Sequence, residues 1–186
     1  MTQPARLYVV VSGPPAAGKS TLAAELAPRL GLPLLAKDTL KHALMTVLPV
    51  PDVATSRLVG RAAVAALLAV AAESGSAVLE STWHRSRAVD DLRRLPGGIV
   101  EVFCRCRRET AAARYRARSG TRAAGHFDSE RVPDELWNDE VAQPVDGGWP
   151  VIVVDTEDVV GMAAVAAQVL HRAGAGPPSL APTPAR

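Results

Sequence analysis

Apolar runs without polar interruption alternate along this chain with longer stretches in which apolar and polar residues mix. Short runs rich in Val, Ile and Leu are typical of parallel strands buried on both faces, and they fall at residues 7–11, 34–36, 77–80, 99–104 and 151–154. The mixed stretches favour helices at residues 22–30, 40–48, 55–73, 85–95, 107–119, 133–141 and 158–171. This alternation predicts an α/β fold, in which helices cover both faces of a parallel sheet.

Glycine, proline and short polar residues mark the boundaries of these elements. Gly31 is expected to end the first helix, and Pro28 predicts a bend within it. Asp38 or Thr39 is a candidate cap for the helix at residues 40–48.

The length and the composition predict one folded domain. A chain of 186 residues is suited to a single sizeable core, which we place at residues 1–173. Residues 174–186 hold four prolines and no core pattern, so a disordered tail is expected there. Residues 120–128 are expected to form a mobile loop.

The charge and the hydropathy argue against several classes of protein. A net charge of +2 does not indicate a general nucleic-acid or membrane binder. The apolar run at residues 61–72 is too short to span a bilayer, and no secretory signal is visible at the N-terminus. Cys104 and Cys106 fit neither a disulfide framework nor a zinc site, so reduced thiols in a cytoplasmic enzyme are expected.

One motif carries most of the chemical information. It fits G-x-x-x-x-G-K-[ST], the phosphate-binding loop, and it lies between a predicted strand and a predicted helix. Glycine lets the backbone amides turn toward an anion, the helix N-terminus adds its dipole, the lysine reaches the β- and γ-phosphates, and the serine hydroxyl binds Mg²⁺. The simpler alternative is a glycine-rich turn that only packs. The predicted nucleotide-binding residues are Gly13, Pro14, Pro15, Ala16, Ala17, Gly18, Lys19, Ser20 and Thr21.

Carboxylates follow the carboxyl ends of several predicted strands, where parallel sheets bind their ligands. Ser20, Asp38, Glu80 and Asp155 are therefore expected to meet in one crevice. A carboxylate at position 38, next to a γ-phosphate, would accept the proton of an attacking hydroxyl. On its position alone, Asp38 is equally well interpreted as a helix cap.

The helix at residues 107–119 is dense in arginine. Arg114 and Arg118 are four residues apart and share a helix face. Seven arginines lie between Arg105 and Arg122, against one acid, and this imbalance favours an anion nearby over a solvated basic face. We interpret the helix as a lid over a triphosphate, which Arg122 would join from the following loop.

Together these segments resemble small P-loop kinases that include chloramphenicol phosphotransferase, the kinase domain of bacteriophage polynucleotide kinase, and zeta-toxin-like kinases. The matching pieces are residues 13–21, 37–41, 78–82, the arginine helix and residues 153–156. The resemblance implies Asp38 as general base, an arginine lid, a sheet of order 2-3-1-4-5, and an adenine ring beside Asp155 and Thr156. The chain departs from polynucleotide kinases at Lys41, where they carry arginine, and at Glu80, where they carry aspartate.

Other residues are candidates for the pocket of the phosphoryl acceptor. Glu80 is expected to hold Mg²⁺ together with Ser20, or to bind the acceptor. Lys41 lies on the same wall by resemblance. Trp83 and His126 are weaker candidates, because single aromatics and histidines more often serve in packing.

The sequence thus favours an ATP- and Mg²⁺-dependent kinase that phosphorylates a hydroxyl of a small molecule. Lys19, Asp38, Arg114 and Arg118 are the predicted catalytic residues. A nucleic-acid 5′-hydroxyl kinase is the first alternative, disfavoured by an aromatic content of 4% and the small net charge. The second alternative is a nucleotide-dependent switch or ATPase without an acceptor, although no guanine-recognition motif such as N-K-x-D is visible.

Overall fold

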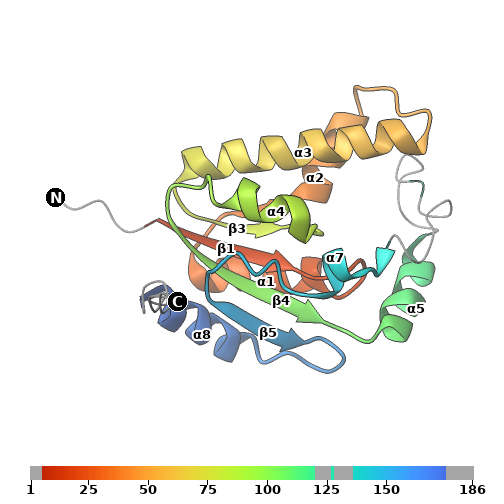
Figure 1. Ribbon diagram of the computed structural model, residues 1–186. Coiled ribbons are helices and arrows are strands. Elements are labelled where there is room, and N and C mark those ends of the chain that lie inside the picture. The colour runs from red at the N-terminus through yellow and green to blue at the C-terminus, as the bar shows by residue number, and fades with distance from the viewer. Residues whose placement is uncertain (1–5, 120–126, 128–135, 175–186) are drawn as a thin grey trace, which may run out of the picture.

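The structure is a computed structural model that describes residues 6–119, 127 and 136–174 (Figure 1). Within these residues the strands pair in parallel in one sheet of order β2-β3-β1-β4-β5. This order confirms the one implied by the family resemblance. The strands are β1 (Leu7–Ser12), β2 (Leu34–Ala36), β3 (Ala77–Glu80), β4 (Gly98–Arg105) and β5 (Val151–Asp155).

Helices cover both faces of the sheet, as the alternating pattern predicted (Figure 1). On one face α1 (Lys19–Leu30) and α8 (Met162–Gly174) pack against the strands. On the other face lie α3 (Val53–Ser74) and α4 (Arg85–Leu92), with α2 (Lys37–Met45) against α3. Beyond the carboxyl end of the sheet lie α5 (Arg108–Ser119) and α7 (Asp139–Ala142).

The central strand β1 shows why the sheet is buried on both faces. Val9 and Val11 enter the core with α1 and α8, whereas Tyr8 and Val10 enter the core with α3 and α4. All four side chains are fully buried. Alternate residues of a strand point to opposite faces, so an uninterrupted apolar run is stable only where both faces are covered.

Several helix starts differ from the prediction, and two of them have a local cause in the structure. The helix α2 begins at Lys37, directly after β2, so Asp38 and Thr39 lie inside its first turn. The N-cap position is Ala36, and neither predicted cap residue holds that place. Asp38 instead lies near the positive end of the helix dipole.

The last helix begins at Met162 rather than at residue 158. Residues before it are held by side-chain contacts that compete with helix formation, because the Glu157 amide donates to Asp155 Oδ1. The helix starts only after Gly161, whose carbonyl accepts from the amides of Ala164 and Val165. For the helix predicted at residues 133–141, the described part contains only α7.

Several predictions fall outside the described residues. These are the contacts of Arg122 and His126, most of the loop at 120–128, and the tail from residue 175 onward.

The helix α3 is, among the described residues, the one that is long and apolar enough to cross a membrane by length and composition. The sequence interpretation considered only residues 61–72 of it. Leu67 and Ala71 of this helix pack into the core with β1 and β3. Apolar core helices of soluble proteins share the same composition, so this property is weak support for a membrane span.

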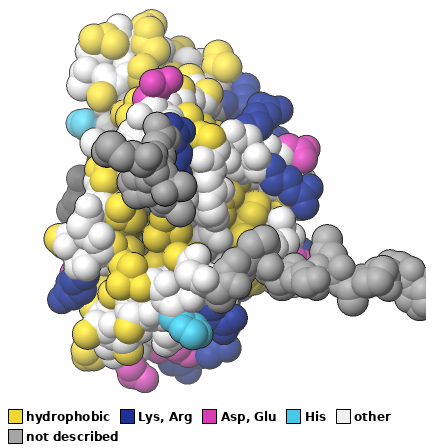
Figure 2. All heavy atoms as spheres, turned by 90° about the vertical axis from the view of Figure 1, so that its left-hand side faces the viewer, with side chains coloured by type: hydrophobic (Ala, Val, Ile, Leu, Met, Phe, Trp, Pro, Cys, Tyr) yellow, Lys and Arg dark blue, Asp and Glu magenta, His cyan; other side chains and the backbone are white. Residues whose placement is uncertain are grey.

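The end of the molecule that carries the N-terminal ends of the strands is shown in Figure 2. Hydrophobic and neutral side chains make up most of this face, and basic side chains lie toward its margins. Exposed aliphatic side chains are scattered over several elements, as is usual for a protein surface, and include Leu34, Leu58, Val70, Val153 and Leu170. The functional candidates lie at the opposite end of the sheet.

Candidate functional site

The phosphate-loop motif connects β1 to α1, as predicted. Gly13 has a φ of 132°, and a Cβ atom there would lie 2.6 Å from the Cys104 carbonyl oxygen, so only glycine fits. Gly18, with a φ of 84°, occupies the left-handed N-cap position of α1. Ala16 also has a positive φ, of 63°, which is a strained conformation for a residue with a side chain. The loop therefore has the tight backbone turn that an anion-binding loop requires.

Lys19 is the first residue of α1 and is only 6% exposed. Its Nζ donates to the Pro14 carbonyl oxygen at 2.7 Å, within the same loop. Burial lowers the pKa of Lys19, and the nearby Glu80 carboxyl opposes that shift. A buried ammonium whose charge is only partly balanced is well suited to bind a phosphate.

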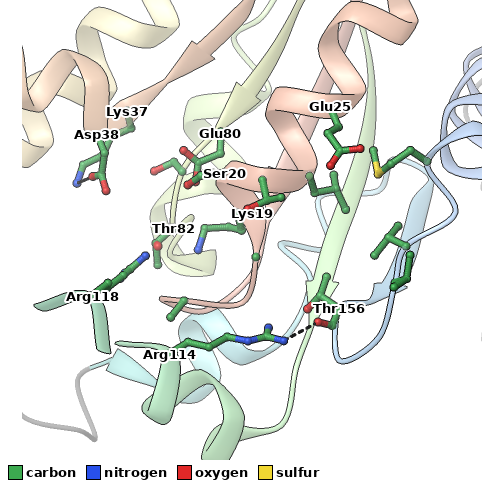
Figure 3. A pocket seen from close by; sticks show the side chains of 18 of the residues that line it. Lys19, Ser20, Glu25, Lys37, Asp38, Glu80, Thr82, Arg114, Arg118 and Thr156 are labelled. Atoms are coloured by element: carbon green, nitrogen blue, oxygen red, sulfur yellow. Dashed lines mark hydrogen bonds and ion pairs between the residues drawn. The ribbon is translucent and has the colours of Figure 1, made fainter. Parts of the chain in front are cut away.

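Ser20 and Glu80 form a pair of oxygen-bearing side chains beside Lys19 (Figure 3). Glu80 is the last residue of β3, is 6% exposed, and accepts a hydrogen bond from the Ser20 hydroxyl. Burial raises the pKa of Glu80, while the charge of Lys19 lowers it. The residues predicted to bind a metal are thus together at the phosphate loop.

Asp38 projects from the first turn of α2 toward the same region (Figure 3). The neighbouring Lys37 Nζ donates to Asp38 Oδ1 at 3.0 Å. Asp38 is close enough to Glu80 and Lys19 for its charge to act on the pKa of each of them.

Arg114 and Arg118 both extend from α5 toward the phosphate loop (Figure 3). Arg114 Nη2 donates to the Thr156 carbonyl oxygen at 3.0 Å. The Arg118 guanidinium lies over the Tyr115 ring, 5.2 Å from its centroid. The shared helix face inferred from their spacing is therefore the face that meets the loop.

A carboxylate fixes the start of α5. Glu157 accepts hydrogen bonds from the backbone amide and the guanidinium of Arg107, at 2.7 to 3.1 Å, and from the Thr110 hydroxyl at 3.0 Å. Cys106 Sγ donates to the same carboxylate at 3.2 Å. These contacts lower the pKa of Glu157 to about 2. They tie the arginine helix to the segment that follows β5.

Two adjoining cavities meet at these residues. The first, of about 560 Å³, is lined by the phosphate loop, the start of α1, Arg114 and the segment around Thr156. The second, of about 880 Å³, lies between α3 and α4. Both volumes are in the range of small-molecule sites. The residues that line both cavities are Lys37, Asp38, Ser81, Thr82 and Arg118.

The sequence matches the family model of the AAA domain over residues 9–144. The chain belongs to the AAA domain family. None of the curated proteins matches the sequence of this AAA-domain protein.

Solved structures share the fold over nearly the whole chain. A protein from Chloroflexus aurantiacus described as a kinase is 28% identical, with a TM-score of 0.81, over 91% of this chain and 99% of that one. A gluconokinase from Sinorhizobium meliloti is 20% identical, with a TM-score of 0.59, over 93% and 94% of the two chains. The APS kinase of Mycobacterium tuberculosis is 18% identical, with a TM-score of 0.60, over 91% and 98%. The last two likenesses concern the fold alone.

The expected crevice collects three of the four strand-end residues of this AAA-domain protein. Ser20, Asp38 and Glu80 line the first cavity, but Asp155 does not. Asp155 is turned outward, where its carboxylate pairs with Arg105 at 3.3 Å. Its neighbour Thr156 lines the cavity, and the Thr156 hydroxyl lies 2.9 Å from the Ala17 carbonyl oxygen.

The remaining described candidates line the second cavity. Lys41 is 3% exposed and its Nζ donates to the Ser56 hydroxyl at 2.7 Å. Trp83 is also buried and lines this cavity. Neither residue lines the first cavity, although Pro15 of the phosphate loop also borders the second.

Sequence reasoning missed several residues that line the cavities. Thr82 lies between both cavities, and Arg61 and Arg87 face the second one from α3 and α4. Periodicity placed both arginines on predicted helices, but no motif marked which helix face would meet a cavity. Trp137, whose indole donates to the Pro15 carbonyl oxygen at 3.2 Å, also carried no signal.

Proposed function

We propose that this AAA-domain protein is an ATP- and Mg²⁺-dependent kinase that transfers the γ-phosphoryl group to a hydroxyl of a small molecule. The observation that carries the proposal is the position of Asp38. Its carboxylate lies where the cavity of the phosphate loop meets a second cavity of sufficient size for an acceptor.

In this reaction the acceptor oxygen bonds to the γ-phosphorus, and the bond from that phosphorus to the β–γ bridging oxygen breaks. The proton of the acceptor hydroxyl passes to the Asp38 carboxylate. Lys19, the loop amides, Arg114 and Arg118 stabilise the negative charge on the transferring group. Movement of the arginine helix as a lid would exclude water and limit hydrolysis.

Ser20 and Glu80 fit a magnesium ion. Mg²⁺ prefers oxygen ligands and is held by few protein groups together with phosphate oxygens, and a hydroxyl and a buried carboxyl lie side by side at the loop. A bound Mg²⁺ would neutralise part of the charge of the phosphates.

The relatives support this proposal. The three solved structures named above are each described as kinases, and the most similar of those three shares 28% of its residues with this chain. Within P-loop kinases, we place the chain near the chloramphenicol phosphotransferase, polynucleotide kinase and zeta-toxin-like group, on the motifs at 13–21, 37–41 and 78–82.

The test combines an acceptor screen with one substitution. The protein is incubated with ATP, Mg²⁺ and a library of hydroxyl compounds, and phosphorylated products are detected by mass spectrometry. Asp38→Asn should lose about two to four orders of magnitude in turnover, the usual contribution of a general base, yet bind ATP as before. Asp90→Asn, on the exposed face of α4, is the matched control.

Full activity of Asp38→Asn would remove this residue from the role of base. Steady ATP hydrolysis that no hydroxyl compound alters would instead favour the switch or ATPase function.

A further inference from the structure

We infer that the acceptor is an amphipathic organic anion. Its hydroxyl lies at Asp38, an apolar body lies along the second cavity, and an acidic group, carboxylate or phosphate, is bound by arginines of α3 and α4. The inference rests on the proposed function and adds the chemical class of the acceptor.

The charge of the second cavity carries the first step. Seven Lys or Arg side chains line it, against two aspartates. The whole chain has 21 Lys and Arg and 19 Asp and Glu, so the cavity takes a third of all cations and about a tenth of the acids. Such a local excess attracts anions and disfavours cations.

The arginines come from two facing elements. Arg57 and Arg61 are four residues apart on α3 and share a helix face. Arg87 lies on α4, and Arg94 follows two residues after the end of that helix. All four line the same cavity. The basic side chains therefore lie on both walls of the space between the two helices.

Two of these arginines have no acidic partner in the part of the chain that the structure describes. Arg94 pairs with Asp91 at 3.7 Å, but within residues 6–119, 127 and 136–174 no ion pair or hydrogen bond engages the side chain of Arg61 or Arg87. Deeper in the cavity, the buried Lys41 donates to the neutral hydroxyl of Ser56. Guanidinium groups suit carboxylate and phosphate oxygens, so Arg61 and Arg87 are placed to bind an acidic group of a ligand.

The floor of the cavity gives the second part of the acceptor. Val64 and Leu68 of α3, together with Trp83 and Leu95, line it between the basic side chains. The aliphatic side chains among them cannot hydrogen-bond to the hydroxyls of a sugar, and the Trp83 indole N–H is itself buried. A polyol bound against these side chains would lose water without compensation. An aromatic or aliphatic body fits this floor better than a sugar ring does.

The experiment uses matched pairs of arylalkyl alcohols, each an acid and its uncharged amide. One such pair is para-(hydroxymethyl)benzoate and para-(hydroxymethyl)benzamide, with longer homologues and the phosphate monoesters as further members. A single-stranded oligonucleotide with a free 5′-hydroxyl is included. Product formation with ATP and Mg²⁺ is measured as kcat/KM.

The acids should be preferred over their amides by about ten- to a hundredfold, the usual worth of a charge-assisted hydrogen bond. The double variant Arg61→Gln, Arg87→Gln should lose this preference because its KM for the acid rises, whereas its KM for ATP should be unchanged. Arg172→Gln, an exposed arginine of α8 outside both cavities, should keep it. Comparison of the carboxylate with the phosphate members identifies which acidic group is bound.

Equal phosphorylation of acids and amides, or a preference that survives the double variant, would overturn the inference and leave the kinase function standing. Preferred phosphorylation of the oligonucleotide would also overturn it, in favour of a nucleic-acid acceptor. No transfer to any probe, with ATP binding intact, would count against the proposed function itself.

Discussion

Glu80 combines burial with a position beside the Ser20 hydroxyl, and burial raises its pKa. A raised pKa keeps more of the carboxyl protonated at a given pH, and a protonated carboxyl is a poor ligand for Mg²⁺. The Mg²⁺ concentration needed for half-maximal activity should therefore rise as the pH falls toward that pKa. Kinetic titrations of Mg²⁺ over a series of pH values measure this change.

Glu80→Gln removes the titrating group and should need more Mg²⁺ for half-maximal activity. That Mg²⁺ concentration should no longer change with pH over the same interval. Asp90→Asn should behave as the natural protein does. If the natural protein needed the same Mg²⁺ concentration for half-maximal activity at every pH of the series, the assignment of Glu80 to the metal would be contradicted.

Some residues of the site could be predicted from the sequence because their type is dictated by backbone geometry. Gly13 and Gly18 have positive φ values, and the motif that requires glycine at both positions can be recognised in the sequence. Ala16 also has a positive φ although it is not a glycine, and no feature of the sequence predicts this conformation. Asp38 was readable as a carboxylate at a strand end, but only the structure shows that it is not a helix cap.

At the scale of the elements, Glu157 joins the arginine helix to the segment after β5. Its pKa is lowered from the ordinary 4.5 to about 2 by the hydrogen bonds from Arg107, Cys106 and Thr110. For a lowered carboxyl pKa, the stabilisation is fully present above the unfolded value of 4.5 and is lost as the pH falls through the folded value of about 2.

Glu157→Gln should consequently lower the thermal unfolding midpoint at neutral pH, and the difference from the natural protein should shrink as the pH falls from 4.5 toward 2. Unfolding followed by circular dichroism measures both midpoints. Glu73→Gln, on an exposed turn of α3, is the control. A difference between the variant and the natural protein that does not change over this pH range would exclude the ionised carboxylate as the source of the stabilisation.

The elements themselves were largely predictable, because strands buried on both faces must be apolar throughout. The residues at which the helices begin were less predictable. The helix α2 follows β2 without a loop, and the last helix is delayed by the contacts of Glu157 and Asp155, which bring together residues distant in sequence. The cavity between α3 and α4 was not predictable, since no local pattern records how two helices are spaced on a sheet.

At the scale of the whole molecule, a buried carboxyl joins three segments of the chain. Glu101 of β4 is fully buried and accepts from the Ser12 hydroxyl at 2.5 Å, the Val145 amide at 2.8 Å and the Trp149 indole at 3.1 Å. In the sequence it is visible only as a charged residue inside an apolar strand. Such a residue must be satisfied within the fold, but its partners are far away along the chain.

Glu101→Ala should destabilise the protein by about 3 kcal/mol or more, because each unsatisfied buried donor costs about 1–3 kcal/mol. Glu101→Gln keeps one acceptor oxygen and should lose less. Urea unfolding monitored by tryptophan fluorescence measures both changes, again with Glu73→Gln as the control. Unchanged stability of Glu101→Ala would show that water replaces the carboxyl at no cost.

The shared wall of the two cavities has a consequence for inhibition. Since Asp38, Thr82 and Arg118 border both spaces, a single bivalent molecule with a nucleoside polyphosphate at one end and an acid-bearing aromatic tail at the other would span them. Covalent linkage makes the binding of the second half intramolecular, so its effective concentration reaches the millimolar range for a short tether. The binding of its tail would depend on side chains of α3 and α4 that lie outside the first cavity.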